Sequence, residues 1–208
     1  MATFVYDDDV DVFPVRIETE RLELTAVERG RTDPREIYDH TRVGARAIDE
    51  ITAYVTWDPH ESLRDAIEFV DGMTEKREED RGTEYVIRPK PGEDGAGEFA
   101  GVGGIGVDWD RRLASFGFWL RKRFWGRGYS GERAAAFVEL AFEDLDLDIV
   151  EVFHFPDNDK SESAIAGYVE AHGGRREGLL RHHDATGGEV TDQVRYTITA
   201  EEYRESRD

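Results

Sequence analysis

A cationic stretch punctuated by glycines, RKRFWGRGYSG, occupies residues 121–131, and we call it the cradle. A strand-like segment, 114–120, precedes it, and a helix-like segment, 132–143, follows it. A loop that leads from a strand into a helix start offers unpaired backbone N–H groups and the positive end of the helix dipole to an anion. Five basic residues lie from Arg121 to Arg133 against one acid, Glu132, in a chain with a formal net charge of -20. We interpret the cradle as a diphosphate site, with a solvated, Arg-rich helix entry as the alternative.

Part of the cradle, from Gly126 to Gly131, also matches the dinucleotide-binding pattern G-x-G-x-x-G. Five residues separate the end of the strand-like segment from Gly126, which is too many for the tight turn of that motif. The remaining chain supplies one further helix before a terminal hairpin, whereas a doubly wound sheet requires continued βαβ alternation. No Gly-Lys-Ser/Thr follows the glycines, as a P-loop requires. Both nucleotide-binding folds are therefore disfavoured.

The elements before the cradle follow a distinctive order. Alternating apolar residues predict a first strand at 21–27. Asp33 and Pro34 begin a helix that runs to about Arg46, and a second helix runs from about His60 through Met73. Further strands are predicted at 85–87, 98–107 and 114–120, joined by turns at 89–97 and 108–112. The glycines within 98–107 indicate a bulge or a close approach of another group to the backbone.

The chain after the cradle helix alternates again before it ends in a hairpin. A strand is predicted at 148–155 and a helix at 163–172, which Gly173 and Gly174 end. Segments 175–183 and 189–199 form a closing hairpin around Gly187 and Gly188. We expect an acidic N-terminal arm at 1–15, a single domain at 16–200 and a C-terminal tail at 201–208.

Composition is consistent with one folded domain with a highly acidic surface. The 208 residues suit a single full core, and 38% hydrophobic with 11% aromatic residues favour folding over disorder. Acidic residues number 47 against 27 basic ones, of which only four are lysine. This surface fits a halophilic cytoplasm, where salt screens the self-repulsion. An acidic surface for a basic partner is the alternative, and the dependence of stability on salt distinguishes the two.

Several classes of function are disfavoured. The negative charge repels phosphate backbones, so no nucleic-acid partner is expected. The chain has no cysteine, which removes disulfides and thiol chemistry. No apolar run reaches membrane-spanning length, and the N-terminus, MATFVYDDDVDVF, is acidic where a signal peptide is basic. We therefore expect a soluble, cytoplasmic protein with no membrane partner and no metal site.

The order of elements and four motifs resemble the Gcn5-related N-acetyltransferase (GNAT) superfamily, most closely its branch that acetylates the N-termini of ribosomal proteins. The resemblance extends from about Ile17 to Thr199. Its motifs are TERLEL at 19–24, FGFWL at 116–120, FWGRGYSGE at 124–132 and NDKS at 158–161. It implies an α/β (α+β) fold, with a mixed, mostly antiparallel twisted sheet of six to seven strands and about four flanking helices. A splay between two parallel strands would form the cofactor site.

The resemblance also implies a site for acetyl-CoA or CoA. In the family, backbone amides of a loop R/Q-x-x-G-x-G/A hold the diphosphate, and that pattern maps onto Trp125, Gly128 and Ser130. Trp replaces Arg or Gln, as is usual in this branch, and Ser replaces Gly or Ala. Neither change should abolish binding, because the amides make the contacts. The other cradle residues assigned to the cofactor are Arg121, Gly126, Arg127, Tyr129 and Gly131.

Two further segments are expected to contact the cofactor. The family's pantetheine arm pairs like an extra strand at the splay, which corresponds to the main chain of Phe118, Trp119 and Leu120. A main-chain N–H near Leu120 is the expected oxyanion donor. Asn158 matches the family's cofactor-contacting asparagine, and Ser161 caps the following helix. A simple turn former is the alternative interpretation of Asn158.

The implied reaction is acetylation of an amine by direct attack in a ternary complex, with no covalent enzyme intermediate. Tyr168 is the candidate general acid, because many relatives carry a tyrosine on this helix. It lies about one turn later than in the usual pattern, and a core-packed tyrosine is the alternative. Glu98, Glu151 and His154 are candidates for the general base, and strand alternation places the last two on opposite faces.

The acceptor implied by the resemblance is the α-amine of a protein or peptide, while a small amine, an amino acid or a drug remains open. Tyr54 and Trp57 lie in the connection between the first two helices, where we expect them to line the substrate site. Packing beneath the loop is the alternative for both. A homodimer is also left open. A non-catalytic acetyl-CoA sensor is a separate alternative, whose signature is cofactor binding without acetyl transfer.

Overall fold

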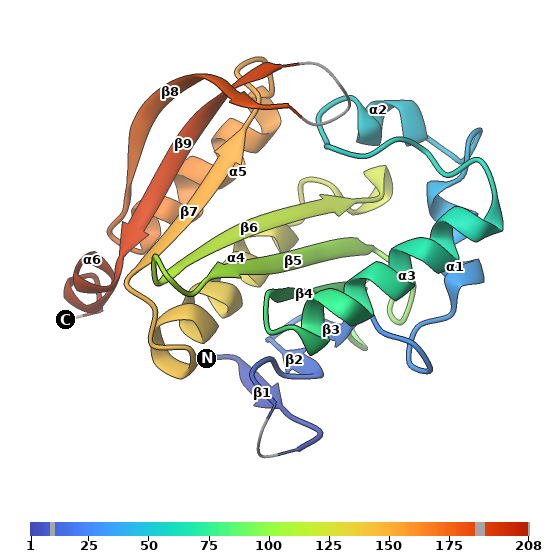
Figure 1. The fold of residues 1–208 in the computed structure, drawn as a ribbon, viewed down its shortest axis with the longest axis horizontal. Helices are drawn as coiled ribbons and strands as arrows, with labels where there is room; N and C mark the ends of the chain where they lie inside the picture. The colour runs from blue at the N-terminus through green and yellow to red at the C-terminus, as the bar shows by residue number, and fades with distance from the viewer. Residues whose placement is uncertain (9–10, 186–189, 208) are drawn as a thin grey trace.

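A computed structural model describes residues 1–8, 11–185 and 190–207 of the chain. Within these residues one nine-stranded sheet has the order β1-β2-β3-β4-β5-β6-β7-β9-β8, with helices on both faces (Figure 1). Neighbouring strands run antiparallel except β6 and β7. The expected mixed, mostly antiparallel α/β fold is confirmed, and the described residues form more strands and helices than the sequence predicts.

The strands are β1 (Thr3–Val5), β2 (Arg16–Glu18), β3 (Leu22–Ala26), β4 (Gly82–Pro89), β5 (Gly101–Asp108), β6 (Leu113–Leu120), β7 (Ile149–His154), β8 (Arg175–Asp184) and β9 (Thr191–Thr199). The α-helices are α1 (Pro34–Thr41), α2 (Ile48–Thr52), α3 (Leu63–Glu78), α4 (Tyr129–Glu139), α5 (Asp159–Ala171) and α6 (Ala200–Glu205). A 3₁₀ turn, Lys122–Phe124, precedes α4, and a π-helical turn, Leu140–Asp144, extends it. In the described part of the chain, no helix has the length and apolar character needed to cross a bilayer.

Both ends of the chain join the packed structure. The N-terminal segment expected to be an acidic arm contains β1, which pairs with β2 so that Phe4 lies opposite Ile17. The expected C-terminal tail forms most of α6, which a capping box between Thr199 and Glu202 begins and whose Tyr203 is buried. The ordered elements therefore extend beyond 16–200 in both directions.

Helix α1 begins where the sequence predicts, because the Asp33 side chain accepts a hydrogen bond from the backbone N–H of Arg35 at 2.9 Å. It ends at Thr41, short of the predicted end, where Arg42 is extended and forms a bridge with His60. The chain then forms the short helix α2, which the sequence pattern does not predict.

Among the other boundaries that differ from those predicted, three have a clear local reason. Helix α3 begins at Leu63, after a capping box between Ser62 and Asp65. Strand β5 begins at Gly101, because Glu98 closes a turn with a backbone hydrogen bond to Gly95. Helix α5 begins at residue 159, because residue 158 is its N-cap. The strands of the final hairpin are confirmed, whereas the predicted turn at 187–188, with residue 189, lies outside the described residues.

The sheet separates two hydrophobic cores. Helices α1 and α3 cover one face, and the smaller core there comprises Val27, Ile37, Ala66, Val70, Val86, Phe99 and Val102. Helices α4 and α5 cover the other face (Figure 1). Because side chains alternate along a strand, Phe116 of β6 packs against Phe137 of α4, whereas Trp119 packs against Phe99 in the smaller core.

The parallel pair of strands opens into a wedge. Strands β6 and β7 pair from Leu113 opposite Ile149 to Phe116 opposite Val152. Beyond Phe116, β6 pairs only with β5, and beyond Val152, β7 pairs only with β9. The strands therefore splay apart, as the resemblance implies.

Candidate active site

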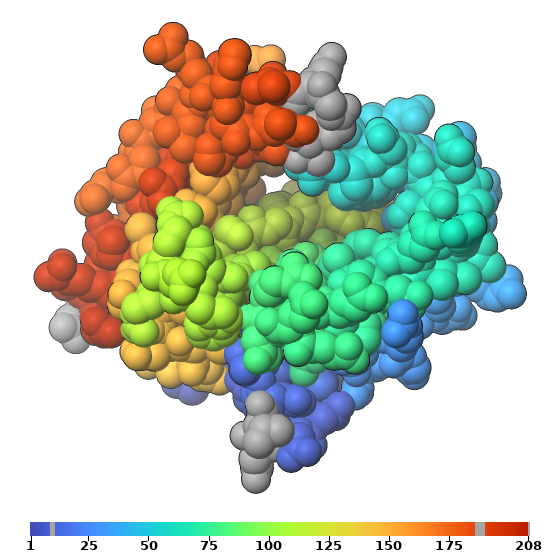
Figure 2. Space-filling model, in the orientation of Figure 1, coloured from blue at the N-terminus to red at the C-terminus, as the bar shows by residue number. Residues whose placement is uncertain are grey.

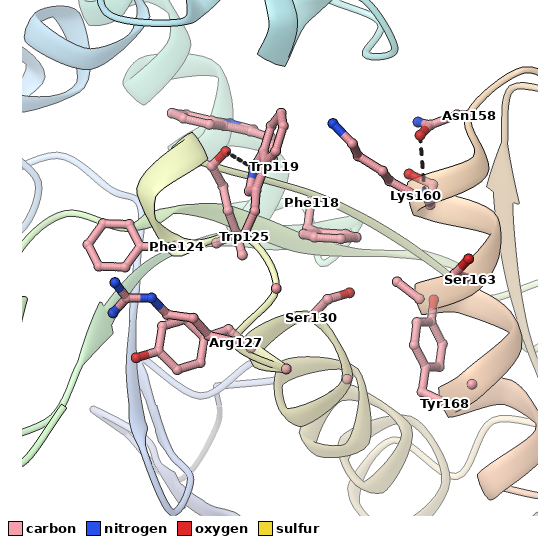
Figure 3. Close-up of a pocket in the computed structure, with 18 of the residues that line it drawn as sticks. Phe118, Trp119, Phe124, Trp125, Arg127, Ser130, Asn158, Lys160, Ser163 and Tyr168 are labelled. Atoms are coloured by element: carbon pink, nitrogen blue, oxygen red, sulfur yellow. Dashed lines mark hydrogen bonds between the residues drawn. The ribbon is translucent and has the colours of Figure 1, made fainter. Parts of the chain in front are cut away.

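A cleft of about 1710 Å³ opens at the wedge. Its walls come from the end of β6, the cradle, the start of α4, one side of α5 along its length, residues 20–21, and the end of α2 with the residues after it. Figure 2 shows the molecular face hollowed between the α2 segment and the β8–β9 hairpin. In Figure 3, Phe118, Ser130 and Tyr168 point into the space between α4 and α5. The expected cofactor residues that line the cleft are Phe118, Trp119, Leu120, Trp125, Gly126, Arg127, Gly128, Tyr129, Ser130, Gly131, Asn158 and Ser161.

Main-chain groups of Phe118 and Leu120 face the wedge. The N–H of Arg121 donates to the Ala100 carbonyl at 2.7 Å, and in an antiparallel pair every second residue bonds to the same neighbour. The N–H and C=O of Trp119 therefore point toward β5, and those of Phe118 and Leu120 point away from it. The expectation that an extended ligand pairs with all three residues is corrected, because β5 already occupies the main chain of Trp119.

The cradle presents free backbone N–H groups at the start of α4. Gly128 is the N-cap, with a φ of 78°, and no side chain caps the helix. The first hydrogen bond of the helix joins the Glu132 N–H to the Gly128 carbonyl at 3.1 Å, so the N–H groups of residues 128–131 have no partner within the helix. A Cβ at Gly126 would meet nothing within 4 Å, and the Ser130 hydroxyl is buried without a hydrogen-bond partner. The open space, the amides and the orphaned hydroxyl fit a diphosphate.

Glu132 clamps the cradle to the start of β3. Its carboxylate accepts hydrogen bonds from the Thr19 hydroxyl at 2.5 Å and from the Arg21 backbone N–H and Nε, each at 2.7 Å. Arg21 also donates from Nη1 to the carbonyl of Arg127 at 2.9 Å. The clamp joins the TERLEL and FWGRGYSGE motifs, although Arg21 and Glu132 lie 111 residues apart in the chain.

The cationic side chains of the cradle are largely neutralised by acids from other segments. The ion pairs are Arg121–Glu98, Lys122–Glu50, Arg123–Glu98, Arg123–Asp94 and Arg127–Asp94. The fifth cation, Arg133, is completely buried. The positive cluster suggested by the sequence is therefore corrected: an anion at the cradle would meet backbone amides and the dipole of α4 more than free cations.

Trp125 links the two walls of the cleft. Its indole N–H donates to the Leu120 carbonyl at 2.7 Å, which fixes the cradle to the end of β6 (Figure 3). From the opposite wall, the Lys160 ammonium lies 4.5 Å from the centre of the Trp125 ring. The side chain of Asn158 accepts a hydrogen bond from the Ser161 N–H at 3.1 Å and so caps α5. Asn158 therefore forms the turn and, in place of the expected Ser161, the cap of α5, while its amide N–H₂ group stays available.

Tyr168 lies on α5 and lines the cleft, with 5% of its surface exposed. Its hydroxyl is buried and has no hydrogen-bond partner. Burial raises the pKa of Tyr168 to about 12, and the Arg133 guanidinium opposes this rise. The phenol therefore remains protonated at neutral pH, which is the state that a general acid requires.

A family model described as an acetyltransferase (GNAT) domain matches residues 29–167 of the chain. The chain belongs to the GNAT acetyltransferase family. It is an acetyl-CoA-dependent N-acetyltransferase, as the resemblance implies.

Individual GNAT relatives are distant in sequence. The N-acetyltransferase p20 of Bacillus licheniformis is 23% identical over 155 residues, covering 74% of this chain and 83% of p20. The structure of Mycobacterium smegmatis RimJ in complex with CoA-disulfide has a TM-score of 0.69 at 21% identity, covering 87% of this chain and 83% of RimJ. The microcin C7 self-immunity acetyltransferase MccE, in complex with acetyl-CoA and AMP, has a TM-score of 0.72 at 20% identity, covering 92% of this chain and 99% of the MccE chain. At these identities the structures establish the fold alone.

The two aromatic residues expected at the acceptor site separate in this GNAT fold. Tyr54 lines the cleft and is 43% exposed, with its ring 6.4 Å from that of Phe155. Trp57 does not line the cleft, and its ring packs 5.4 Å from Trp119 and 6.3 Å from His60. Trp57 therefore follows the alternative interpretation, in which a loop aromatic packs beneath the loop.

Four other expected residues lie outside the lining of the cleft, because each has a partner elsewhere or sits within the core. Arg121 donates to the Phe99 carbonyl at 2.6 Å. Glu98 precedes β5 instead of lying on it and, as described above, pairs with arginines of the cradle. Glu151 pairs with Arg195 of β9 at 2.8 Å. His154 is buried on the opposite face of β7. Among the residues that the structure describes, no group of three or more His, Cys, Asp or Glu side chains is arranged to hold a metal.

Several cleft features are absent from the sequence-based prediction. Lys160 and Arg21 stand within two of the quoted motifs, but their contacts with the cradle arise only in the folded chain, so the sequence assigns neither of them a role. The end of α2 lines the cleft although that helix was itself not predicted. Arg133 carries a sequence signal, since this charged residue stands four positions before Phe137, on the apolar face of the helix.

Proposed function

We propose that this N-acetyltransferase transfers the acetyl group of acetyl-CoA to the α-amine of a protein or peptide. The observation that carries the proposal is the uncapped start of α4 beside the splayed edge of β6. The amides of residues 128–131 would hold the diphosphate, and the main chain of Phe118 would pair with the pantetheine arm. The thioester would then lie near Leu120, the last residue of β6, in the part of the cleft that α5 faces.

The direct reaction needs one proton donor for the leaving group. The amine nitrogen attacks the thioester carbonyl, the new C–N bond forms, and the C–S bond breaks. Tyr168 gives its proton to the departing sulfur, and the proton released by the amine returns to the phenolate through water. The N–H of Leu120 faces the wedge and would donate to the carbonyl oxygen. Water takes the role of base, because Glu98 and Glu151 are engaged in ion pairs away from the cleft.

The size of the cleft favours a macromolecular acceptor, and its charge favours a cationic one. Its volume of about 1710 Å³ exceeds the roughly 300–1,000 Å³ of a typical small-ligand pocket, which leaves room for a chain end beside the donor. Glu20, Asp157 and Asp159 line it and form no ion pair with other described residues. Their negative charge attracts the ammonium form of an amine to the rim. The solved structure of RimJ, from the branch that the motifs resemble, supports the same choice.

Two measurements test the proposal. Isothermal calorimetry with CoA should show binding, and no binding at any salt concentration would overturn the donor site. An acetyl-transfer screen, read by mass, should then compare peptides with free N-termini, the same peptides with blocked N-termini, and small amines. Transfer to the free N-termini is expected. Transfer only to small amines would show that the acceptor is a small amine and not a peptide. Transfer to none of these amines would favour a non-catalytic acetyl-CoA sensor.

The net charge of the enzyme bears on the salt concentration in which it works. We infer a cytoplasm of high salt concentration, because 47 acidic residues against 27 basic ones repel one another unless counterions screen them. The melting temperature should rise steadily between low and molar KCl. A flat or falling dependence would instead favour an acidic surface that serves a basic partner.

A further inference from the structure

Arg133, on the second turn of α4, is the largest completely buried side chain among the described residues. None of its three guanidinium nitrogens has a hydrogen-bond partner. The guanidinium carbon lies 4.7 Å from the centre of the Phe118 ring and 5.0 Å from that of Phe137. Ring faces attract a cation but do not replace hydrogen bonds, so burial of this charge is strongly unfavourable for folding. A buried charge that lowers stability this much indicates that the guanidinium acts on a neighbouring group.

The fold makes room for this side chain. A Cβ at Gly103 of β5 would lie 2.9 Å from the Cδ of Arg133, so any larger residue at 103 would push the arginine from its position. Gly103 lies opposite Phe118 in the sheet, and Phe118 lines the cleft. The guanidinium therefore sits directly behind a residue of the cleft wall.

The group beside Arg133 that has no other partner is the hydroxyl of Tyr168, across the contact between α4 and α5. Both groups are buried, and each affects the other: the guanidinium lowers the pKa of Tyr168 against the larger effect of burial. No hydrogen bond of good geometry joins them in this state. The other charged group facing Arg133 is Glu84 of β4, which already accepts a hydrogen bond from Lys76 at 3.1 Å.

We propose that Arg133 is a positioning residue for Tyr168, whose buried positive charge stabilises the phenolate that forms when Tyr168 protonates the departing thiolate. The inference rests on the proposed role of Tyr168 as the general acid. During turnover the C–S bond breaks, the sulfur takes the phenolic proton, and the phenolate remains beside the guanidinium until the proton lost by the amine restores it. Arg133 keeps its own protons throughout, because a guanidinium does not deprotonate in proteins.

The test is a double-mutant cycle that combines Arg133→Met with Tyr168→Phe and measures kcat, KM for acetyl-CoA and melting temperature. Alone, Arg133→Met should lower kcat about tenfold, the effect of about one pKa unit on the acid, with KM changed less than about twofold. The melting temperature should rise, because an apolar chain replaces an unpaired buried charge. With phenylalanine at position 168, Arg133→Met should cause no further loss of kcat. Equal losses in both backgrounds, or a lower melting temperature with unchanged kcat, would assign Arg133 a structural role.

Arg133→Lys provides a second readout that does not depend on the methionine variant. Burial lowers the pKa of a lysine ammonium, so the variant should carry the charge at low pH and lose it as pH rises. The ratio of its kcat to that of the wild type should therefore fall between about pH 6 and pH 9, whereas a packing role gives a constant ratio. Tyr168→Phe alone tests the proposed function separately. An unchanged kcat in this variant would overturn the role of Tyr168 as general acid, whatever the Arg133 variants show.

Discussion

Helices α4 and α5 both begin at the cleft, but they begin differently. The N-cap of α4 is Gly128, which has no side chain to cap the helix. The N-cap of α5 is Asn158, whose side chain accepts a hydrogen bond from the Ser161 N–H. Both starts carry the positive end of a helix dipole, yet all the first amides of α4 stay open, whereas the cap of α5 engages the Ser161 N–H. The comparison teaches that a helix start can offer its amides to an anion when no side chain caps the helix.

The two walls therefore depend on sequence in different ways. The α4 wall acts through main-chain groups, so Trp125 and Ser130 can depart from the family pattern without loss of the amides. The α5 wall acts through side chains that project into the cleft, among them Lys160 and Tyr168 (Figure 3). We expect the function of the α4 wall to be sensitive to changes in backbone conformation and charge. We expect the function of the α5 wall to be sensitive to the identity of its side chains.

The largest effect is expected from closing the start of α4. Gly128→Asp tolerates the positive φ, because aspartate adopts this conformation more readily than most residues, but it places a carboxylate at the amides. Two like charges about 4 Å apart repel by about 4 kcal/mol near a protein surface, so CoA affinity should fall about a thousandfold in calorimetry.

Gly44→Asp is the matched control for Gly128→Asp. Gly44 has the same φ of +78° and open space around it, and it lies outside the lining of the cleft. It should carry the same conformational cost and leave CoA affinity unchanged. An unaltered affinity in Gly128→Asp would mean that the diphosphate binds elsewhere and that the comparison of the two helix starts fails.

Prediction from the sequence succeeded where the signal is local. Strand, glycine turn and helix follow one another within the cradle, so its position and its amides were predictable from a short window. The acids that neutralise its cations are not, because Asp94 lies about thirty residues away and Glu50 about seventy. The same limit explains Glu98 and Glu151: their types suit a base, but only the fold reveals the arginines that engage them.

The next effect concerns chemistry on the α5 wall. Tyr168→Phe should lower kcat about a hundredfold, the usual contribution of a general acid, and leave CoA affinity unchanged. Because burial raises the pKa of Tyr168 to about 12, the phenol keeps its proton throughout the assay range. The wild type should therefore show no loss of kcat from ionisation of this acid below about pH 11. A full-activity Phe variant would leave Tyr168 as a core residue that happens to line the cleft.

Asn158 allows the cap and the cofactor contact to be separated. Asn158→Asp keeps the acceptor oxygen of the cap but replaces the amide donor with negative charge, so stability should be retained while CoA affinity falls about tenfold. Asn158→Ala removes both groups and should in addition cost about 1 kcal/mol of unfolding free energy. Calorimetry and thermal unfolding measure the two effects independently. Wild-type affinity in both variants would show that Asn158 serves only as the cap of α5.

The smallest effect is expected at Lys160, which projects from α5 toward Trp125 and forms no ion pair with the described residues. Lys160→Met should weaken CoA binding about threefold at 0.1 M salt, and the difference should vanish at 1 M, where the Debye length is only about 3 Å. Arg64→Met, on the exposed side of α3 and away from the cleft, makes the same change in net charge and should leave affinity unchanged. Equal losses in the two variants would mean that the overall charge of the protein governs CoA binding. In that case the position of Lys160 on the α5 wall would contribute nothing.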